Sequence, residues 1–323
     1  MKKTLTSVVV AVALMVIAVG PAFAQGQITV AADSSSGTYA KVLGEIIGVC
    51  STPDFDIKVA ATTGGAVGNL QALVENKAQA AFLHSDVYQF NAQSDPTYNK
   101  FQTLLALFPE QIHILAKKQS GLTKTITEPG RVFGTNTRQV PAEFNSLADI
   151  DGFKVGGAGG GWVTVRVLKG SGPDAKFVPT EYSSGGELQK ALDSGEIAAA
   201  IFVGAAPLPN LEKLDRSKYK LLPIGAAIAD RLSNAYRVST VNYPGMTSGP
   251  VKTLAPLATL MTRKYSTPDK IAAQRHLREC VYKNLPMLQD DASPSWQEVK
   301  ANDQGIATMP WLDLGPSPTP AKK

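Results

Sequence analysis

The chain has 323 residues, of which 44% are hydrophobic and 18% are charged, and its formal net charge is +5 at pH 7. This length exceeds one typical domain and provides enough apolar residues for two cores. The Lys and Arg residues form no dense stripe, so the sequence lacks the clustered basic face that nucleic-acid binding requires.

The N-terminus has the three parts of an export signal. Lys2 and Lys3 form a basic n-region, residues 7–19 an apolar h-region, and residues 22–24 (AFA) a cleavage site. The apolar run is shorter than the span of about 20 residues that crosses a membrane. We therefore expect residues 1–24 to be a cleaved signal peptide and the mature chain to be periplasmic, with an uncleaved anchor as the alternative.

In the first half of the chain, short apolar runs alternate with segments of helical periodicity. We expect strands at residues 28–32, 55–61 and 78–83, and helices at residues 39–49, 65–75 and 85–90. Strands that alternate with helices predict a mostly parallel sheet, in which ligands bind beyond the carboxyl ends of the strands. Residues 25–108 are therefore expected to form most of a first α/β lobe.

The chain is expected to cross into a second lobe at Pro109-Glu110, so that this lobe spans residues 109–225. We expect strands at residues 153–155, 176–179, 197–203 and 219–224, and helices at residues 162–168, 186–194 and from 207 onward. Residues 119–150 are rich in Pro, Gly, Asn and Thr and have little periodicity. They predict a long loop or a partly ordered insertion.

Residues 226–315 are expected to return to the first lobe and pack on it. An apolar stretch at 253–262 leads back, and a long amphipathic helix is expected over 268–288. The Pro-rich tail, residues 316–323, is expected to be disordered. An exported chain with two cysteines, Cys50 and Cys280, suits a disulfide that would tie this helix to the first lobe. Two separate buried thiols remain the alternative.

Each half of the chain contains two loops of small residues that precede a helix. They are residues 34–38 (SSSGT), 62–65 (TTGG), 159–162 (GGGW) and 183–186 (SSGG). Helix N-termini carry unsatisfied N–H groups and partial positive charge, and glycine lets a ligand approach that backbone. Four such loops at equivalent places in two halves predict a cleft that holds a small anion.

The expected ligand-binding residues lie in these loops or beside them. They are Ser35, Ser36, Gly37, Thr38, Tyr39, Thr63, Gly64, Gly65, Ser85, Asp86, Gly160, Gly161, Trp162, Ser184, Gly185 and Gly204. For Tyr39 and Trp162, packing beside the cleft is an open alternative to ligand contact. Asp86 is expected first of all to begin a helix, with contact to a ligand amine as the second interpretation.

Other chemistries fit the sequence less well. The glycine run at 156–161 has the strand–helix context of a dinucleotide site, but no acidic residue is well placed about 20 positions later. His84, Ser85 and Asp86 are the ingredients of a hydrolase, but sequence neighbours do not make a triad and no G-x-S-x-G elbow occurs. Metal-ligand spacings are absent as well. The sequence therefore predicts a binding protein without cofactor or metal, rather than an enzyme.

Taken in order, the motifs resemble the TAXI family, the extracytoplasmic solute receptors of TRAP transporters. The likeness covers about residues 28–118 and 151–225. It lies in residues 35–39 (SSGTY), 63–65 (TGG), 85–87 (SDV), 107–113 (LFPEQIH) and 202–207 (FVGAAP). The resemblance implies a two-lobed periplasmic-binding-protein fold, type II-like, with a hinge between the lobes. It also implies a small carboxylate or amino acid such as glutamate as ligand, delivered to a membrane permease driven by an ion gradient.

The sequence departs from this family at the second-lobe loop. The family usually has Gly-Ser-Gly-Thr there, whereas residues 159–162 are GGGW, so a bulky ring replaces two hydroxyl donors. Two alternatives remain within the expected fold. One is a receptor for an ABC transporter, and the other is a degenerate receptor that acts as an envelope sensor or interaction protein.

Overall fold

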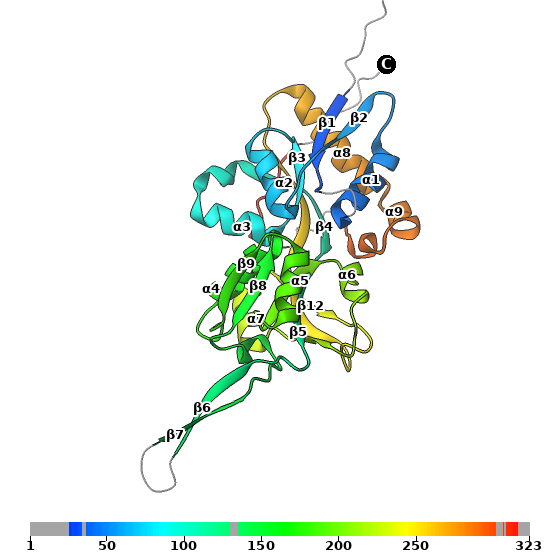
Figure 1. Ribbon diagram of the computed structural model, residues 1–323. Helices are drawn as coiled ribbons and strands as arrows, with labels where there is room; N and C mark the ends of the chain where they lie inside the picture. Colours follow the sequence, from blue (N-terminus) through cyan, green and yellow to red (C-terminus); the bar gives the residue numbers. More distant parts are fainter. Residues whose placement is uncertain (1–25, 34–36, 130–134, 302–305, 307, 316–323) are drawn as a thin grey trace, which may run out of the picture.

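The computed structural model describes residues 26–33, 37–129, 135–301, 306 and 308–315. They form two α/β lobes, and a β hairpin projects from the second lobe (Figure 1). The α/β class with two lobes is confirmed. The expected signal peptide and the Pro-rich tail lie outside the described residues. Within the described ranges, none of the helices combines the length and the apolar character of a membrane span.

The first lobe is built on a five-stranded sheet of order β2-β1-β3-β14-β4. Its strands are β1 (Gly26–Ala31), β2 (Phe55–Ala60), β3 (Ala80–His84), β4 (Phe101–Pro109) and β14 (Leu257–Arg263). Its helices are α1 (Thr38–Cys50), α2 (Gly65–Val74), α3 (Ser85–Ser94), α8 (Pro268–Lys283) and α9 (Leu285–Asp291), with 3₁₀ turns η1 (Pro96–Lys100) and η3 (Pro294–Glu298). β1 runs parallel to β2 and β3, whereas β14 is antiparallel to β3 and β4. β3 and β4 are buried along almost their whole length, as expected for strands covered on both faces.

The second lobe repeats this plan with a five-stranded sheet of order β11-β5-β10-β8-β9. Its strands are β5 (Gln111–Lys117), β8 (Lys154–Ala158), β9 (Val178–Tyr182), β10 (Ala199–Gly204) and β11 (Tyr219–Leu222). Its helices are α4 (Gly160–Gly170), α5 (Gly185–Ser194), α6 (Pro209–Glu212) and α7 (Ala226–Leu232), with the turn η2 (Leu147–Asp149). The helix expected from residue 207 thus begins at Pro209 and has only four residues.

The chain crosses between the lobes twice at one place. Glu110 joins β4 to β5, and Pro256 joins β14 to β13 (Val251–Ala255), which pairs with β12 (Arg237–Val241). The Glu110 N–H donates a hydrogen bond to the Pro256 carbonyl oxygen at 2.9 Å. Two extended crossings held side by side form a hinge about which two lobes can rotate.

Residues 119–150 contain a hairpin where the sequence predicts a long loop or a partly ordered insertion. β6 (Thr123–Pro129) and β7 (Thr135–Pro141) pair antiparallel and project away from the body of the second lobe (Figure 1). Most side chains on both strands are exposed, so neither face carries the alternating apolar pattern that reveals a strand. After the hairpin, Phe144, Leu147 and Ile150 enter the core of the second lobe.

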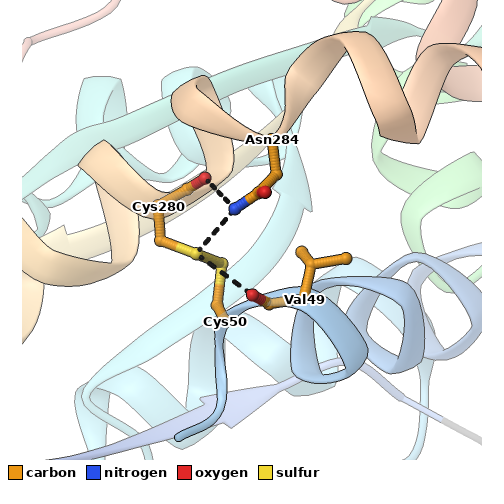
Figure 2. Close-up of a disulfide and its surroundings, with 4 residues drawn as sticks. All are labelled: Val49, Cys50, Cys280 and Asn284. Carbon is orange, nitrogen blue, oxygen red and sulfur yellow. Dashed lines mark hydrogen bonds between the residues drawn. A yellow bond between two sulfur atoms is a disulfide. The ribbon is translucent and has the colours of Figure 1, made fainter.

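A disulfide joins Cys50 at the end of α1 to Cys280 in α8, with a Cα–Cα distance of 5.8 Å (Figure 2). Of the two arrangements that the sequence leaves open, the structure has the bridge. Its cysteines are 230 positions apart, so the loop that it closes contains the whole second lobe. Asn284, one turn beyond Cys280, donates a hydrogen bond to the Cys280 carbonyl oxygen at 3.0 Å.

The long helix expected over residues 268–288 is divided in two. α8 ends at Lys283, and α9 starts at Leu285 with Pro286 in its first turn. Because proline has no N–H, Pro286 cannot continue the hydrogen-bond ladder of α8, but the first turn of a new helix tolerates it.

Candidate functional site

A cavity of about 630 Å³ lies between the lobes, at the carboxyl ends of strands from both sheets. The first lobe and the hinge contribute Ala32, Asp33, Gly37, Thr38, Tyr39, Thr63, Gly64, Gly65, Ala66, His84 and Glu110. The second lobe contributes Ala158, Gly159, Gly160, Gly161, Ser183, Ser184, Gly185, Leu188, Ile201, Phe202, Val203, Gly204, Leu208 and Asn210.

The structure brings most of the expected site residues together around this cavity. Those that line it are Gly37, Thr38, Tyr39, Thr63, Gly64, Gly65, Gly160, Gly161, Ser184, Gly185 and Gly204. They lie where α1, α2, α4 and α5 begin and where β10 ends, since each of these helices starts at or within one residue of a lining glycine. The expected residues Ser35 and Ser36 lie outside the described residues.

Three expected site residues lie elsewhere. Ser85 is buried, and its Oγ accepts a hydrogen bond from the Leu257 N–H at 3.0 Å. Trp162 is half-buried and packs on the second-lobe core, with the Arg166 guanidinium 5.9 Å from its ring centre. Asp86 is buried in a network described below. These side chains therefore bind the protein itself, and Ser85 is not placed as a nucleophile facing the cavity.

At α2, the expected anion cradle already has a carboxylate beside it. The Asp33 N–H donates to Thr62 Oγ1 and to Asn69 Oδ1, both at 2.9 Å, which fixes the residue at φ 66°. A Cβ built on Gly65, the first residue of α2, would lie 3.9 Å from Asp33 Oδ2. The partial positive charge at this helix end is thus next to a negative side chain of the protein.

At α5, the protein also caps its own helix. Ser184 Oγ accepts a hydrogen bond from the Glu187 N–H at 3.2 Å, and Ser183 Oγ donates to the Glu187 carboxylate at 2.6 Å. Glu187 lies in the first turn, where an acidic side chain complements the helix dipole. A ligand therefore meets a helix end whose donors are already partly satisfied.

Glu110 is a cavity residue that the sequence placed only at the crossing between the lobes. It is 4% exposed, and Tyr39 OH donates to its Oε2 at 2.5 Å. Burial raises the pKa of Glu110 above its ordinary value, although the neighbouring His84 and the Tyr39 hydrogen bond oppose the rise. Within the described part of the chain, Tyr39 is the one hydrogen-bond partner of this carboxylate.

The balance of charge around the cavity is acidic. Its lining includes Asp33 and Glu110, and the described lining residues include no Lys or Arg. Residues 34–36, next to Asp33 in the sequence, are all serine. His84 is the one lining side chain in the described ranges whose ordinary pKa makes it a candidate cation near neutral pH, and it already contacts a carboxylate. No group of three or more metal-ligating side chains occurs in the described residues either.

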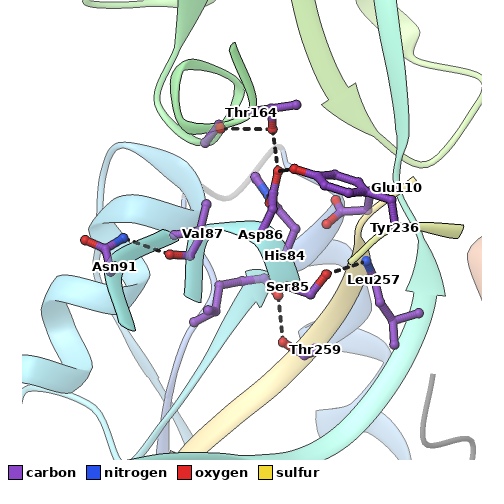
Figure 3. A network of polar contacts seen from close by, with 12 residues as sticks. His84, Ser85, Asp86, Val87, Asn91, Glu110, Thr164, Tyr236, Leu257 and Thr259 are labelled. Carbon is purple, nitrogen blue, oxygen red and sulfur yellow. Dashed lines mark hydrogen bonds and ion pairs between the residues drawn. The ribbon is translucent and has the colours of Figure 1, made fainter. Parts of the chain in front are cut away.

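Asp86 joins the two lobes through a buried polar network (Figure 3). Its Oδ1 lies 2.5 Å from His84 Nδ1, and its Oδ2 accepts hydrogen bonds from Thr164 Oγ1 and Tyr236 OH, each at 2.7 Å. Thr164 in α4 and Tyr236 just before β12 belong to the second lobe, whereas His84 and Asp86 belong to the first. The lobes are therefore closed on one another in this structure.

The ionisation of this network follows from its contacts. Burial alone would raise the pKa of Asp86, but His84 and the hydroxyls of Thr164 and Tyr236 hold it below its usual value. Burial alone would lower the pKa of His84, but the Asp86 carboxylate outweighs burial and raises it. Both shifts favour the charged forms of His84 and Asp86, and the second carboxylate oxygen of Asp86 receives two hydroxyl donors from the second lobe.

Glycines in the second-lobe loop permit this closure. A Cβ on Gly160 would lie 2.1 Å from His84 Nε2, so no side chain fits there while the lobes are closed. Gly159 has φ 53°, and a Cβ on it would lie 3.1 Å from the Gly64 carbonyl oxygen. The loop that the sequence predicts to hold a ligand thus also packs against the first lobe.

No protein-family profile matches this chain. Its fold resembles that of Tv2483 bound to L-arginine, with 10% identity, coverage of 82% of this chain and 87% of that one, and a TM-score of 0.50. It is also similar to an amino acid ABC transporter substrate-binding protein from Streptococcus pneumoniae bound to L-arginine, with 13% identity, coverage of 85% and 97%, and a TM-score of 0.47. A third similar structure is the periplasmic sulfonate-binding protein SsuA from Methylobacillus flagellatus, with 10% identity, coverage of 83% and 70%, and a TM-score of 0.49. At these identities the likeness concerns the fold alone.

Proposed function

We propose that this protein is an extracytoplasmic solute receptor, not an enzyme, that binds a small carboxylate or amino acid between its lobes. The observation that carries the proposal is the interlobe cavity of about 630 Å³, into which the N-termini of four helices open. Backbone N–H groups at these ends can donate hydrogen bonds to a ligand carboxylate, and the volume suits a small molecule. The structural neighbours support the proposal, because those bound to L-arginine are binding proteins of the same fold.

In this proposal, the two lobes close when a ligand binds, and the closed shape distinguishes the loaded receptor from the empty one. Residues from both lobes line the cavity, so a bound ligand contacts both and stabilises the closed arrangement. The hydrogen bonds from Thr164 and Tyr236 to Asp86 form only when the lobes meet, and they add to that preference. A membrane partner can then distinguish the closed from the open shape.

The partner in this proposal is a TRAP-type permease, and the site of action is the periplasm. The TAXI-like motifs support the permease, and the signal-like N-terminus supports export. An ABC permease is the second candidate, because the structural neighbours include binding components of ABC import systems. The neighbouring genes separate the two, since a TRAP system has large membrane subunits and an ABC system has an ATPase.

A thermal-shift screen of residues 25–323 against amino acids and small acids tests the receptor proposal. At a hundredfold excess over Kd, a ligand that binds only the native state adds about 2.7 kcal/mol to the free energy of unfolding. We expect a selective shift, and we expect mass spectrometry to detect the same ligand released from purified protein. A folded protein that responds to no compound and carries no ligand would contradict the proposal.

Two neighbouring glycines provide a matched pair of variants for this screen. A Cβ on Gly185 would face the cavity, with only Phe202 Cε1 nearby at 3.8 Å, whereas Gly186 is exposed and does not line the cavity. Gly185→Leu should therefore abolish the shift by filling the site, and Gly186→Leu should leave it unchanged. Equal shifts in both variants would place the ligand outside the cavity.

A further inference from the structure

We infer that the solute carries a cationic nitrogen, an ammonium or guanidinium group, which pairs with Glu110 and Asp33. The net charge of the ligand is then zero or positive, and acids that lack such a nitrogen are rejected. This inference rests on the proposed function, because it assumes that the interlobe cavity binds a solute. It narrows the carboxylates and amino acids considered above to those that have a positive group.

The charges on the cavity wall are the first argument. Two carboxylates line the cavity, and no Lys or Arg lines it in the described residues. His84 neighbours Glu110, but it is also 2.5 Å from the buried Asp86 carboxylate, so one cationic side chain is shared between two acidic ones. An anion without a positive group would therefore enter a desolvated space with negative charge on its wall, where Coulomb interactions are stronger than in water.

The buried carboxylate of Glu110 also points to a positive partner. Its carboxylate is more than nine-tenths buried, and Tyr39 OH binds only one of its two oxygens. An ionised carboxylate has about four acceptor positions, and Oε1 has no described hydrogen-bond partner. A buried charge costs free energy unless it is paired, so a residue of this kind at a cavity wall indicates a partner of opposite charge.

Acidic side chains of the protein lie at two of the helix N-termini that face the cavity. Asp33 lies beside the first residue of α2, and Glu187 lies in the first turn of α5. The partial positive charge of two helices is thus partly offset by the protein itself. A ligand carboxylate still finds N–H donors at these ends, but the charge that remains uncompensated in the cavity is negative. The arrangement suits a zwitterion or a cation better than a dicarboxylate.

Glu110 also occupies the hinge. It lies between β4 and β5, and its N–H is bonded to Pro256 on the second crossing strand. A cation bound to this carboxylate would therefore sit at the point about which the lobes turn. Selection of the positive group and closure of the lobes would then depend on the same residue.

Calorimetric titration of the mature protein with matched compounds tests the inference. One comparison sets L-ornithine against valerate, so that both amines are lost at constant chain length, and agmatine adds a cation without a carboxylate. L-glutamate and glutarate both have a negative net charge, and neither is expected to bind. We expect binding only among compounds that have a cationic nitrogen and a net charge of zero or above. Loss of the ammonium groups, from L-ornithine to valerate, should weaken binding about 30-fold or more, as for the loss of one member of a buried charge pair.

Variants of the two carboxylates assign the effect to them. Glu110→Gln keeps the shape and an acceptor for Tyr39, and it should weaken binding of the amine about 30-fold or more. The same change should not lower the melting temperature of the ligand-free protein, because burial already disfavours the charged form of Glu110 and raises its pKa; a residue with a purely structural role would show a fall. Asp33→Asn suits the left-handed backbone and should weaken binding less, since Asp33 is only half-buried. Glu143→Gln, on the exposed surface of the second lobe, is the control and should change neither quantity.

The outcomes separate the inference from the proposed function. If glutarate binds, or if valerate binds as tightly as L-ornithine, in a manner abolished by Gly185→Leu, the receptor stands and the cation inference is overturned. Unchanged amine affinity in both Glu110→Gln and Asp33→Asn would also overturn it. If no compound in this set or in the wider screen binds a folded protein, the receptor proposal fails and the inference fails with it. Should Glu110→Gln not fold, Asp33→Asn and the matched compounds still decide the question.

Discussion

A single added methyl group, in Gly160→Ala, should hold the two lobes apart. The new Cβ would lie 2.1 Å from His84 Nε2, whereas nonbonded heavy atoms pack at about 3.5 Å, so the two groups must separate by about 1.4 Å. The imidazole cannot easily turn away, because it is buried and its Nδ1 is bonded to Asp86. The separation therefore has to come from movement of α4 relative to the first lobe.

The cost can be worked out from the contacts that α4 makes. Moving Thr164 by about 1.4 Å would lengthen its 2.7 Å bond to Asp86 beyond hydrogen-bonding range. A hydrogen bond to a charged group contributes about 1.5–3 kcal/mol, which corresponds to about tenfold to 100-fold in the population of the closed state. Because alanine favours helix over glycine by up to about 1 kcal/mol, overall folding stability should change little.

The assay combines ligand affinity with the radius of gyration from small-angle X-ray scattering. Gly160→Ala should bind ligand about tenfold to 100-fold more weakly and should have a larger radius than the wild type at the same ligand concentration. Gly170→Ala at the other end of α4 is the control, since a Cβ there has nothing within 4 Å. Wild-type affinity and an unchanged radius in Gly160→Ala would refute the reasoning.

Three further predictions concern stability. Asp86→Asn leaves His84 buried beside a neutral group and should lower the free energy of unfolding by about 3–5 kcal/mol in urea titrations. Tyr236→Phe removes one hydroxyl donor to Asp86 and should lower the free energy of unfolding by about 1–3 kcal/mol. Wild-type stability in Asp86→Asn would exclude an ionised pair. The pKa of His84 is raised in the folded state, so the protonated imidazole stabilises the fold. This contribution is complete below about pH 6.5, the ordinary pKa of histidine, and it is lost as pH rises through the folded-state pKa. The melting temperature should therefore fall above pH 6.5, and it should fall less in His84→Gln. Equal slopes in the two proteins would contradict this. Replacing Cys50 and Cys280 by alanine should lower the free energy of unfolding by up to about 5 kcal/mol, because the bridge closes a very long loop in the unfolded chain; an unchanged melting temperature after reduction would argue against it.

The parts of the fold that sequence reasoning predicts are those with local signals. The alternation of apolar runs and helical periodicity predicts β1, β3 and α2, because a strand buried on both faces, such as β3, is apolar throughout and a helix buried on one face is apolar at helical spacing. The glycine loops predict the start of α2 and α5 because only small residues suit a helix end at a cavity. The hairpin β6–β7 has no such signal, since both of its faces are exposed.

Several contacts in the candidate site cannot be predicted from local sequence patterns. Asp86 and Tyr236 are 150 positions apart, and neither side chain carries a local pattern that would pair them. Asp33 and Glu110 are ordinary acidic residues in the sequence, and only the fold shows that both line one cavity. The glycine loops therefore indicate residues that line the interlobe cavity, whereas the sign of the charge around that cavity depends on the positions of side chains from distant segments.

A crystal structure of the mature protein with the tightest-binding compound from the screen tests the central claim most directly. The account predicts one molecule between the closed lobes, with a nitrogen within hydrogen-bonding distance of the Glu110 carboxylate and a second polar group near the start of α5. A ligand bound outside the interlobe cavity would contradict the claim that this protein is a two-lobed solute receptor.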